Sequence, residues 1–96
     1  MTKHDIVDRI AQATGLTRVE TEAVVTGFMV CVSDSLADGE RVELRGFGVF
    51  DVADRAARRA RNPSTGESLA VAARRVPVFR PSRDLKNRVH PPDDDA

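Results

Sequence analysis

The sequence describes one small domain of 96 residues, in which fifteen basic and fifteen acidic side chains leave no net formal charge. A chain of this length buries only part of its surface and is marginally stable alone. No apolar run reaches the ~20 residues of a membrane-spanning helix, the first residues form no apolar signal region, and a single cysteine excludes an intramolecular disulfide. We therefore expect a cytoplasmic protein without a membrane partner.

Two helices are predicted in the first 40 residues, each beginning with a capping box. Thr2 and Asp5 form the first box, and Gly15 is placed to end that helix. Thr17 and Glu20 form the second box, immediately before the next helix. The chain is thus expected to begin with a helical hairpin.

The second predicted helix, from about Arg18 to Ala37, has an apolar middle. Residues 28–32 read Phe-Met-Val-Cys-Val and are apolar around nearly the whole helix, which predicts burial on more than one side. Cys31 is expected to be a small core residue. In so small a chain, a second copy of the helix is the simplest cover for this run.

Three strands and a short helix are predicted after Gly39. The segment 41–44 alternates like a strand, and 46–50 is expected to continue it, with glycines that indicate bending or close backbone approach, through Asp54 into the arginine region. A return strand is expected between Leu69 and Phe79. Ser82 can cap a final helix from Arg83 to about Val89. The order of elements predicts an α+β fold.

Charge divides sharply along the chain. Residues 52–90 hold ten basic and three acidic side chains, a net charge of +7, whereas residues 1–51 hold five basic and nine acidic ones, a net charge of −4. The acidic tail Asp93 to Asp95 supplies the remaining −3. Within the basic half, Asn62-Pro63-Ser64-Thr65-Gly66 has the composition of a turn between two arginine-rich strands. Such a ribbon is suited to a polyanion such as nucleic acid.

The arginines of this ribbon are expected on both of its faces, because side chains alternate along an extended strand. On a continuous strand Arg55, Arg59 and Arg61 would share one face and Arg58 would lie on the other. The neighbours Arg74 and Arg75 would also point in opposite directions. Because an isolated ribbon is marginally stable in water, it is expected to be mobile until DNA orders it.

Pro63, at the predicted tip, has two interpretations. Its rigid ring could wedge between base pairs and kink a duplex. Alternatively, Pro63 only shapes the turn. The residues by themselves favour the second interpretation.

Several segments at fixed spacing resemble the HU/IHF family of bacterial histone-like proteins. They are Gly46-Phe47-Gly48-Val49-Phe50, Arg55, Arg58, Ala60, Asn62 to Glu67, Ala73-Arg74-Arg75-Val76, Phe79-Arg80-Pro81 and Leu85-Lys86. The resemblance extends from about Thr2 to Val89. It implies an intertwined dimer with a two-helix base, a three-stranded sheet with a long β-ribbon arm, and a short C-terminal helix. It also implies that the arms hold bent DNA through the minor groove and that Pro63 intercalates.

On this basis we expect a DNA-binding domain over residues 1–90, an arm at about 53–76, and a flexible acidic tail at 91–96. The expected DNA-binding residues are Arg55, Arg58, Arg59, Arg61, Asn62, Pro63, Arg74, Arg75, Arg80 and Lys86. The expected dimer core comprises Phe28, Phe47, Phe50 and Phe79. The tail is either a solubilising end or a DNA mimic that competes for the arms.

Other functions are less well supported by the sequence. His4 and His90 have no partners at metal-ligand spacing, no nucleophile has a convincing base, and no cofactor or small-molecule substrate is indicated. The absence of Trp and Tyr favours duplex DNA over single strands. The expected protein is therefore a homodimeric, nucleoid-associated DNA-bending protein and not an enzyme. Two alternatives remain: a subunit of a heterodimeric integration host factor, and a dimeric module whose arms bind an acidic protein.

Overall fold

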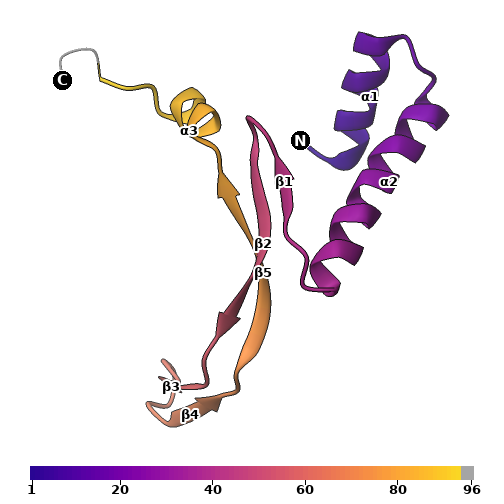
Figure 1. The fold of residues 1–96 in the computed structure, drawn as a ribbon. Coiled ribbons are helices and arrows are strands. Elements are labelled where there is room, and N and C mark those ends of the chain that lie inside the picture. Colours follow the sequence, from indigo (N-terminus) through magenta and orange to yellow (C-terminus); the bar gives the residue numbers. More distant parts are fainter. Residues whose placement is uncertain (94–96) are drawn as a thin grey trace. The chain divides into compact units, whose positions relative to one another are not determined.

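The computed structural model describes residues 1–93 and divides into two units, Met1–Ser35 and the chain from Leu36 onward (Figure 1). Its helices are α1 (Lys3–Thr14), α2 (Arg18–Ala37) and α3 (Arg83–Val89). None of the helices in these 93 residues combines the length and hydropathy needed to cross a membrane. Asp94 and Asp95, which belong to the predicted acidic tail, lie outside the described residues.

The helix caps are those predicted from the sequence. The Thr2 hydroxyl accepts a hydrogen bond from the Asp5 backbone N–H, and the Asp5 carboxylate accepts one from the Thr2 backbone N–H at 2.9 Å. Thr17 and Glu20 form the same reciprocal pair before α2, at 3.1 and 3.3 Å. Gly15 ends α1 with a left-handed φ of 78°, a conformation that glycine adopts without steric cost.

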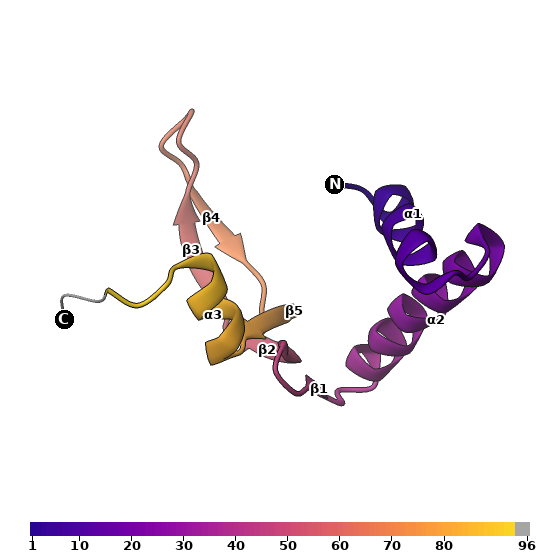
Figure 2. The same ribbon diagram turned by 90° about the horizontal axis from the view of Figure 1, so that it is seen from above.

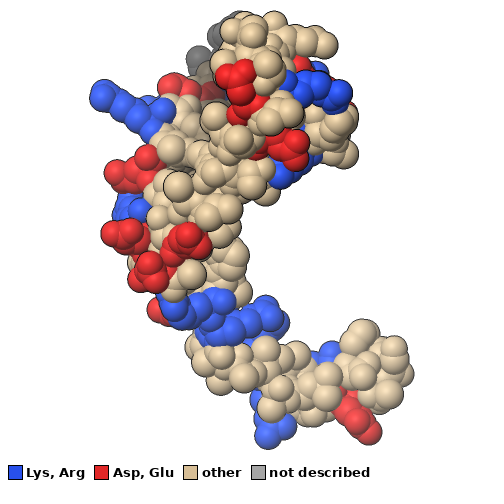
Figure 3. Space-filling view, turned by 90° about the vertical axis from the view of Figure 1, so that its right-hand side faces the viewer, with Lys and Arg blue, Asp and Glu red and all other residues tan. Residues whose placement is uncertain are grey.

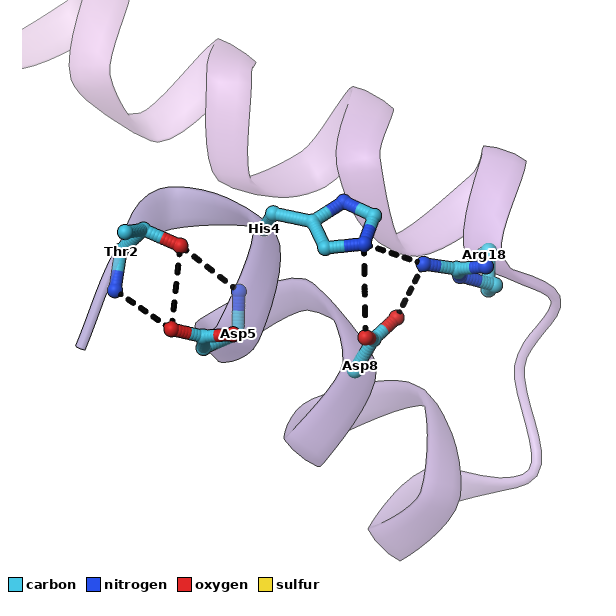
Figure 4. A network of polar contacts seen from close by, with 5 residues as sticks. All are labelled: Thr2, His4, Asp5, Asp8 and Arg18. Carbon is cyan, nitrogen blue, oxygen red and sulfur yellow. Dashed lines mark hydrogen bonds and ion pairs between the residues drawn. The ribbon is translucent and has the colours of Figure 1, made fainter.

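A second group of polar contacts joins α1 to the first residue of α2 (Figure 4). The Arg18 guanidinium lies 2.6 Å from the Asp8 carboxylate and donates to Nε2 of His4 at 2.7 Å. Beside it, hydrogen bonds from the Thr2 backbone N–H and then the Thr2 hydroxyl hold the pKa of Asp5 below its ordinary value. These contacts fix the helical hairpin locally.

The three-stranded sheet is antiparallel, with the order β1 (Val42–Leu44), β2 (Gly48–Arg55) and β5 (Arg74–Pro81). Its β1–β2 register pairs Leu44 with Gly48. The predicted continuation of one strand through residues 45–47 is wrong. These residues form a tight turn in which the Phe47 N–H donates to the Leu44 carbonyl at 2.9 Å.

Beyond the three-stranded sheet, both strands of the ribbon are interrupted, at positions that lie opposite each other. A second, two-stranded sheet of β3 (Arg58–Arg61) and β4 (Ser68–Val71) continues it (Figures 1 and 2). The β2–β5 ladder ends at Arg55 opposite Arg74, and the β3–β4 ladder resumes with Arg58 opposite Val71. Ala56-Ala57 on one side and Ala72-Ala73 on the other lie outside both ladders, and the register is unchanged across them. The predicted continuous strands are therefore wrong at this point.

Little of the described chain is buried, and the aromatic residues of the sheet form the main cluster in the second unit. Phe79 packs between Phe50 and Phe47, with ring centroids 4.9 and 5.3 Å apart. Within residues 1–93 the only buried residues are Val7, Ala11, Thr21 and Gly48. Cys31 is exposed in the single chain, so its predicted core position requires cover from a second copy of the helix and stays a prediction.

Gly48 is expected to be indispensable for this cluster. A Cβ atom at this position would lie 2.6 Å from the Arg80 carbonyl oxygen and 2.6 Å from the Phe79 ring, and a backbone oxygen cannot move aside cheaply. Gly48→Ala should therefore destabilise the fold by about 1–3 kcal/mol or more, measured by urea unfolding. The control is Gly66→Ala, where nothing lies within 4 Å and only an exposed turn is strained. Equal unfolding midpoints for the two variants would contradict the steric explanation.

Candidate nucleic-acid interface

The residues expected to bind DNA are distributed over the ribbon, its tip, the sheet and α3. Arg55 ends β2, and Arg74 and Arg75 begin β5. Arg80 lies near the end of β5, and Lys86 lies on α3. The remaining five expected residues lie on β3 and in the turn at the end of the ribbon: Arg58, Arg59, Arg61, Asn62 and Pro63.

At the base of the ribbon, Arg55 and Arg74 are directly opposite each other in the register. Like charges in this position destabilise a strand pair. Within the described part of the chain, neither guanidinium has a carboxylate within 4.0 Å. Figure 3 shows a band of Lys and Arg side chains on the ribbon. An external anion would relieve this repulsion, so the pair is suited to a phosphate backbone.

On the β3–β4 hairpin, the two faces differ in chemistry. Arg59 and Arg61 alternate onto one face with Ser68, and Arg59 donates to the Ser68 hydroxyl at 3.2 Å. Arg58 lies on the other face, beside the apolar side chains of Ala60, Leu69 and Val71. The ribbon thus carries an arginine on each face, as predicted, but one face is mainly apolar. Alternation cannot place Arg55 relative to these residues, because the strand is broken at Ala56-Ala57.

The tip is a closed turn organised by Asn62. The Asn62 side-chain oxygen accepts from the Ser64 N–H at 2.8 Å, and its carbonyl accepts from the Gly66 N–H at 2.7 Å. The Asn62 N–H donates to the Glu67 carbonyl at 2.8 Å. Pro63 is exposed and takes part in none of these bonds. The turn therefore presents the proline ring to solvent while Asn62 is engaged in shaping the turn.

Arg75 and Arg80 differ from the other arginines of the set. One Arg75 nitrogen lies 3.3 Å from the position that a Cβ atom at Gly39 would take, so Arg75 folds back over the turn that follows α2. Arg80 forms an ion pair with Asp51 at 2.7 Å. Hydrogen bonding from the Val52 backbone N–H, and then from Arg80, holds the pKa of Asp51 below its ordinary value. The Asp51 carboxylate is therefore ionised at neutral pH.

Lys86 has two basic neighbours on α3 that were not among the expected DNA-binding residues. They are Arg83 and Arg88. Their signal was present in the sequence as three basic residues within seven, but seven residues do not define one helix face clearly. The three make this short helix a secondary basic surface.

The expected dimer-core residues are incompletely covered by the single chain. Phe28 and Phe47 are each 46% exposed and Phe79 is 38% exposed, whereas Phe50 is half-buried. On α2, Val24, Met29 and Val30 are at least half exposed as well. Side chains of this size are usually buried, so their exposure leaves an apolar surface without cover.

No group of three or more metal-binding side chains exists among residues 1–93. The described chain combines an α+β fold with a long arginine-bearing ribbon that has an exposed proline at its tip. This ribbon is the candidate surface for a polyanion.

Comparison with known proteins identifies the class. The family model described as "Bacterial DNA-binding protein" matches residues 1–90. The DNA-binding protein HU of Streptococcus thermophilus is 44% identical over 87 residues, which cover 91% of this chain and 96% of that protein. The chain therefore belongs to the family of bacterial DNA-binding proteins that includes HU, a family of DNA-binding proteins and not of enzymes, and the resemblance seen in the sequence is confirmed.

Solved structures agree with this assignment. An Anabaena HU–DNA cocrystal structure superposes with a TM-score of 0.89 at 35% identity, covering 96% of this chain and all of that one. HU from Thermotoga maritima gives a TM-score of 0.68 at 26% identity, covering 93% of this chain and 98% of that one. The predicted α+β fold with three helices and a ribbon-bearing antiparallel sheet is confirmed.

Proposed function

We propose that the protein is a homodimeric architectural protein that binds and bends duplex DNA with its two β-ribbon arms. The arms, at about residues 53–76, enter the minor groove, and binding shapes the nucleoid in the cytoplasm. The observation that carries the proposal is the directly opposed pair Arg55 and Arg74, with no carboxylate partner in the described chain. A protein keeps such a repulsive pair when a functional partner neutralises it.

The ribbon as a whole supports this proposal. None of its six arginines forms an ion pair with a carboxylate of the described residues, so their charge is not neutralised within that part of the chain, although Arg75 folds back over Gly39. They are Arg55, Arg58, Arg59, Arg61, Arg74 and Arg75. The similarity to an HU chain solved with DNA also supports duplex DNA as the partner.

The dimer is supported by the apolar surface of α2 and by the exposed rings of the sheet. In one chain Phe28 on α2 and Phe47 beside the sheet are each 46% exposed, and Val24, Met29 and Val30 on α2 are at least half exposed as well. A second copy of the same chain would supply a self-complementary apolar surface. The resemblance to HU supports a homodimer over a heterodimer with an integration host factor partner.

Two measurements test the function. The mass of the protein in solution, alone and with a short duplex, should show a dimer that binds as a unit. Affinity for duplex DNA should fall linearly with the logarithm of salt concentration, and energy transfer between dyes on the duplex ends should rise on binding. A module for an acidic protein would instead bind duplex weakly and leave the duplex straight.

Pro63→Ala is expected to reduce DNA bending more than affinity. The turn bonds come from Asn62, Ser64 and Gly66, so the tip should keep its shape while the wedge is lost. The measurement is energy transfer between duplex ends on intact and nicked DNA, and the loss should be smallest on nicked DNA, where a kink is cheap. Unchanged bending of intact duplex at saturating protein would rule out the wedge and leave Pro63 as a turn residue.

A further inference from the structure

Arg80 lies on the same face of the sheet as the repulsive pair at the base of the ribbon. Along β5, alternate residues place Arg74 and Arg80 on one face, and along β2 they place Asp51 and Arg55 there too. Phe50 and Phe79 are paired on the opposite face. The surface that begins with Arg55 and Arg74 therefore continues inward to Asp51 and Arg80.

The charge along this continuous face changes where the ribbon meets the sheet. On the ribbon, Arg55 and Arg74 have no carboxylate of residues 1–93 within 4.0 Å, whereas on the sheet Arg80 is 2.7 Å from Asp51. A second sheet-side pair joins Arg41 to Glu43, also at 2.7 Å, and Glu43 is opposite Val49 in the register. Among the described residues, the arginines on the sheet part of this face are thus paired with carboxylates, and those on the ribbon part are not.

The Asp51 carboxylate is held in position for this pairing. One of its oxygens accepts from the Val52 backbone N–H at 2.8 Å and the other accepts from Arg80. Only 25% of the Asp51 side chain is exposed, against 60% of the Arg80 side chain. A carboxylate fixed by the backbone keeps its place when DNA approaches. It occupies the guanidinium and repels a phosphate at the same time.

We propose that Asp51 withholds Arg80 from DNA and thereby confines the phosphate contacts of this chain to its ribbon. The inference rests on the proposed DNA-binding function. Asp51 determines the extent of the DNA contact, and Arg80 is a latent phosphate ligand. Arg80, which the sequence predicts to bind DNA, would then contact a phosphate only when the negative charge of Asp51 is removed.

The test compares Asp51→Asn with wild type on duplex DNA over a series of salt concentrations. Releasing Arg80 should tighten binding at low salt and steepen the slope of log affinity against log salt by about 0.9 for each added phosphate contact. The double variant Asp51→Asn/Arg80→Ala should lose that increase in slope, which would show that the increase acts through Arg80. Asp54→Asn is the matched control, because it makes the same charge change on β2 and Asp54 has no ion pair in the described residues.

The outcomes are distinguishable. The Arg80 side chain is 60% exposed, so solvent screens its ion pair with Asp51 and the pair should contribute little to stability. The melting temperature of Asp51→Asn should therefore be close to that of wild type, and Asp51→Ser serves as a second uncharged variant if it is not. An unchanged salt slope in a folded Asp51 variant, or an increase that persists without Arg80 or appears equally in Asp54→Asn, would overturn the inference alone. A wild-type protein that does not bind duplex would overturn the proposed function and the inference with it.

Discussion

Replacing Arg58, Arg59 and Arg61 together by Ala is expected to weaken binding to every duplex sequence and to flatten its salt dependence. Each arginine that contacts a phosphate releases counterions, and each lost contact lowers the slope of log affinity against log salt by about 0.9. Three lost contacts per chain reduce the slope by about 2.7 for each arm. The three side chains are exposed on a hairpin away from the aromatic cluster, so the fold should persist.

The matched control replaces the same three arginines by Lys. Lysine keeps the charge but loses the bidentate geometry, so the salt slope should stay near that of wild type while affinity falls modestly. Circular dichroism should show the same helical content for all three proteins. If the Ala variant kept wild-type affinity on both random and preferred duplexes, the ribbon would not be the DNA-binding element.

Phe47→Ala is expected to disrupt both the fold and the dimer. Truncating a buried Phe costs about 3–5 kcal/mol, a large part of the stability of a small domain. In the single chain Phe47 is 46% exposed, so it would reach that cost only if a second copy covers it. Urea unfolding at several protein concentrations measures both effects, because the stability of an obligate dimer depends on concentration.

Leu69→Ala provides the comparison. Leu69 is also 46% exposed, but it lies on β4 near the end of the ribbon, where we expect no partner subunit. Its removal should change the unfolding midpoint little. Similar small losses for both variants, together with a mass of one chain in solution, would contradict the proposed dimer and its phenylalanine core.

The helices could be predicted closely from the sequence because their signals are local. Capping boxes at Thr2 and Thr17 join residues three apart, and Gly15 ends α1 through its own backbone freedom. The turn at Asn62 is local in the same sense, since all of its bonds fall within six residues. The division of charge is also a property of sequence alone. These features were enough to indicate a ribbon suited to a polyanion, whereas the family was indicated by the resemblance of several sequence segments at fixed spacing.

Features that depend on strand pairing could not be predicted in this way. The matched interruption at Ala56-Ala57 and Ala72-Ala73 is visible only once two distant segments are paired, and it separates the face of Arg55 from those of the outer arginines. Alanine carries no turn signal, so the sequence along one strand gives no sign of an interruption at Ala56-Ala57 or at Ala72-Ala73.

The contacts of the individual arginines within the chain likewise depend on the tertiary structure. In the sequence, Arg75 and Arg80 cannot be told apart from Arg55 and Arg74. In the structure, Arg75 folds over Gly39, and Arg80 pairs with Asp51, which is 29 residues away in the chain. The sequence by itself determined the helices, the turn and the sign of the charge on the ribbon, because each depends on near neighbours or on composition. Only the tertiary structure decided which cations remain available to a partner, because register sets the distance between charges that are remote in the chain.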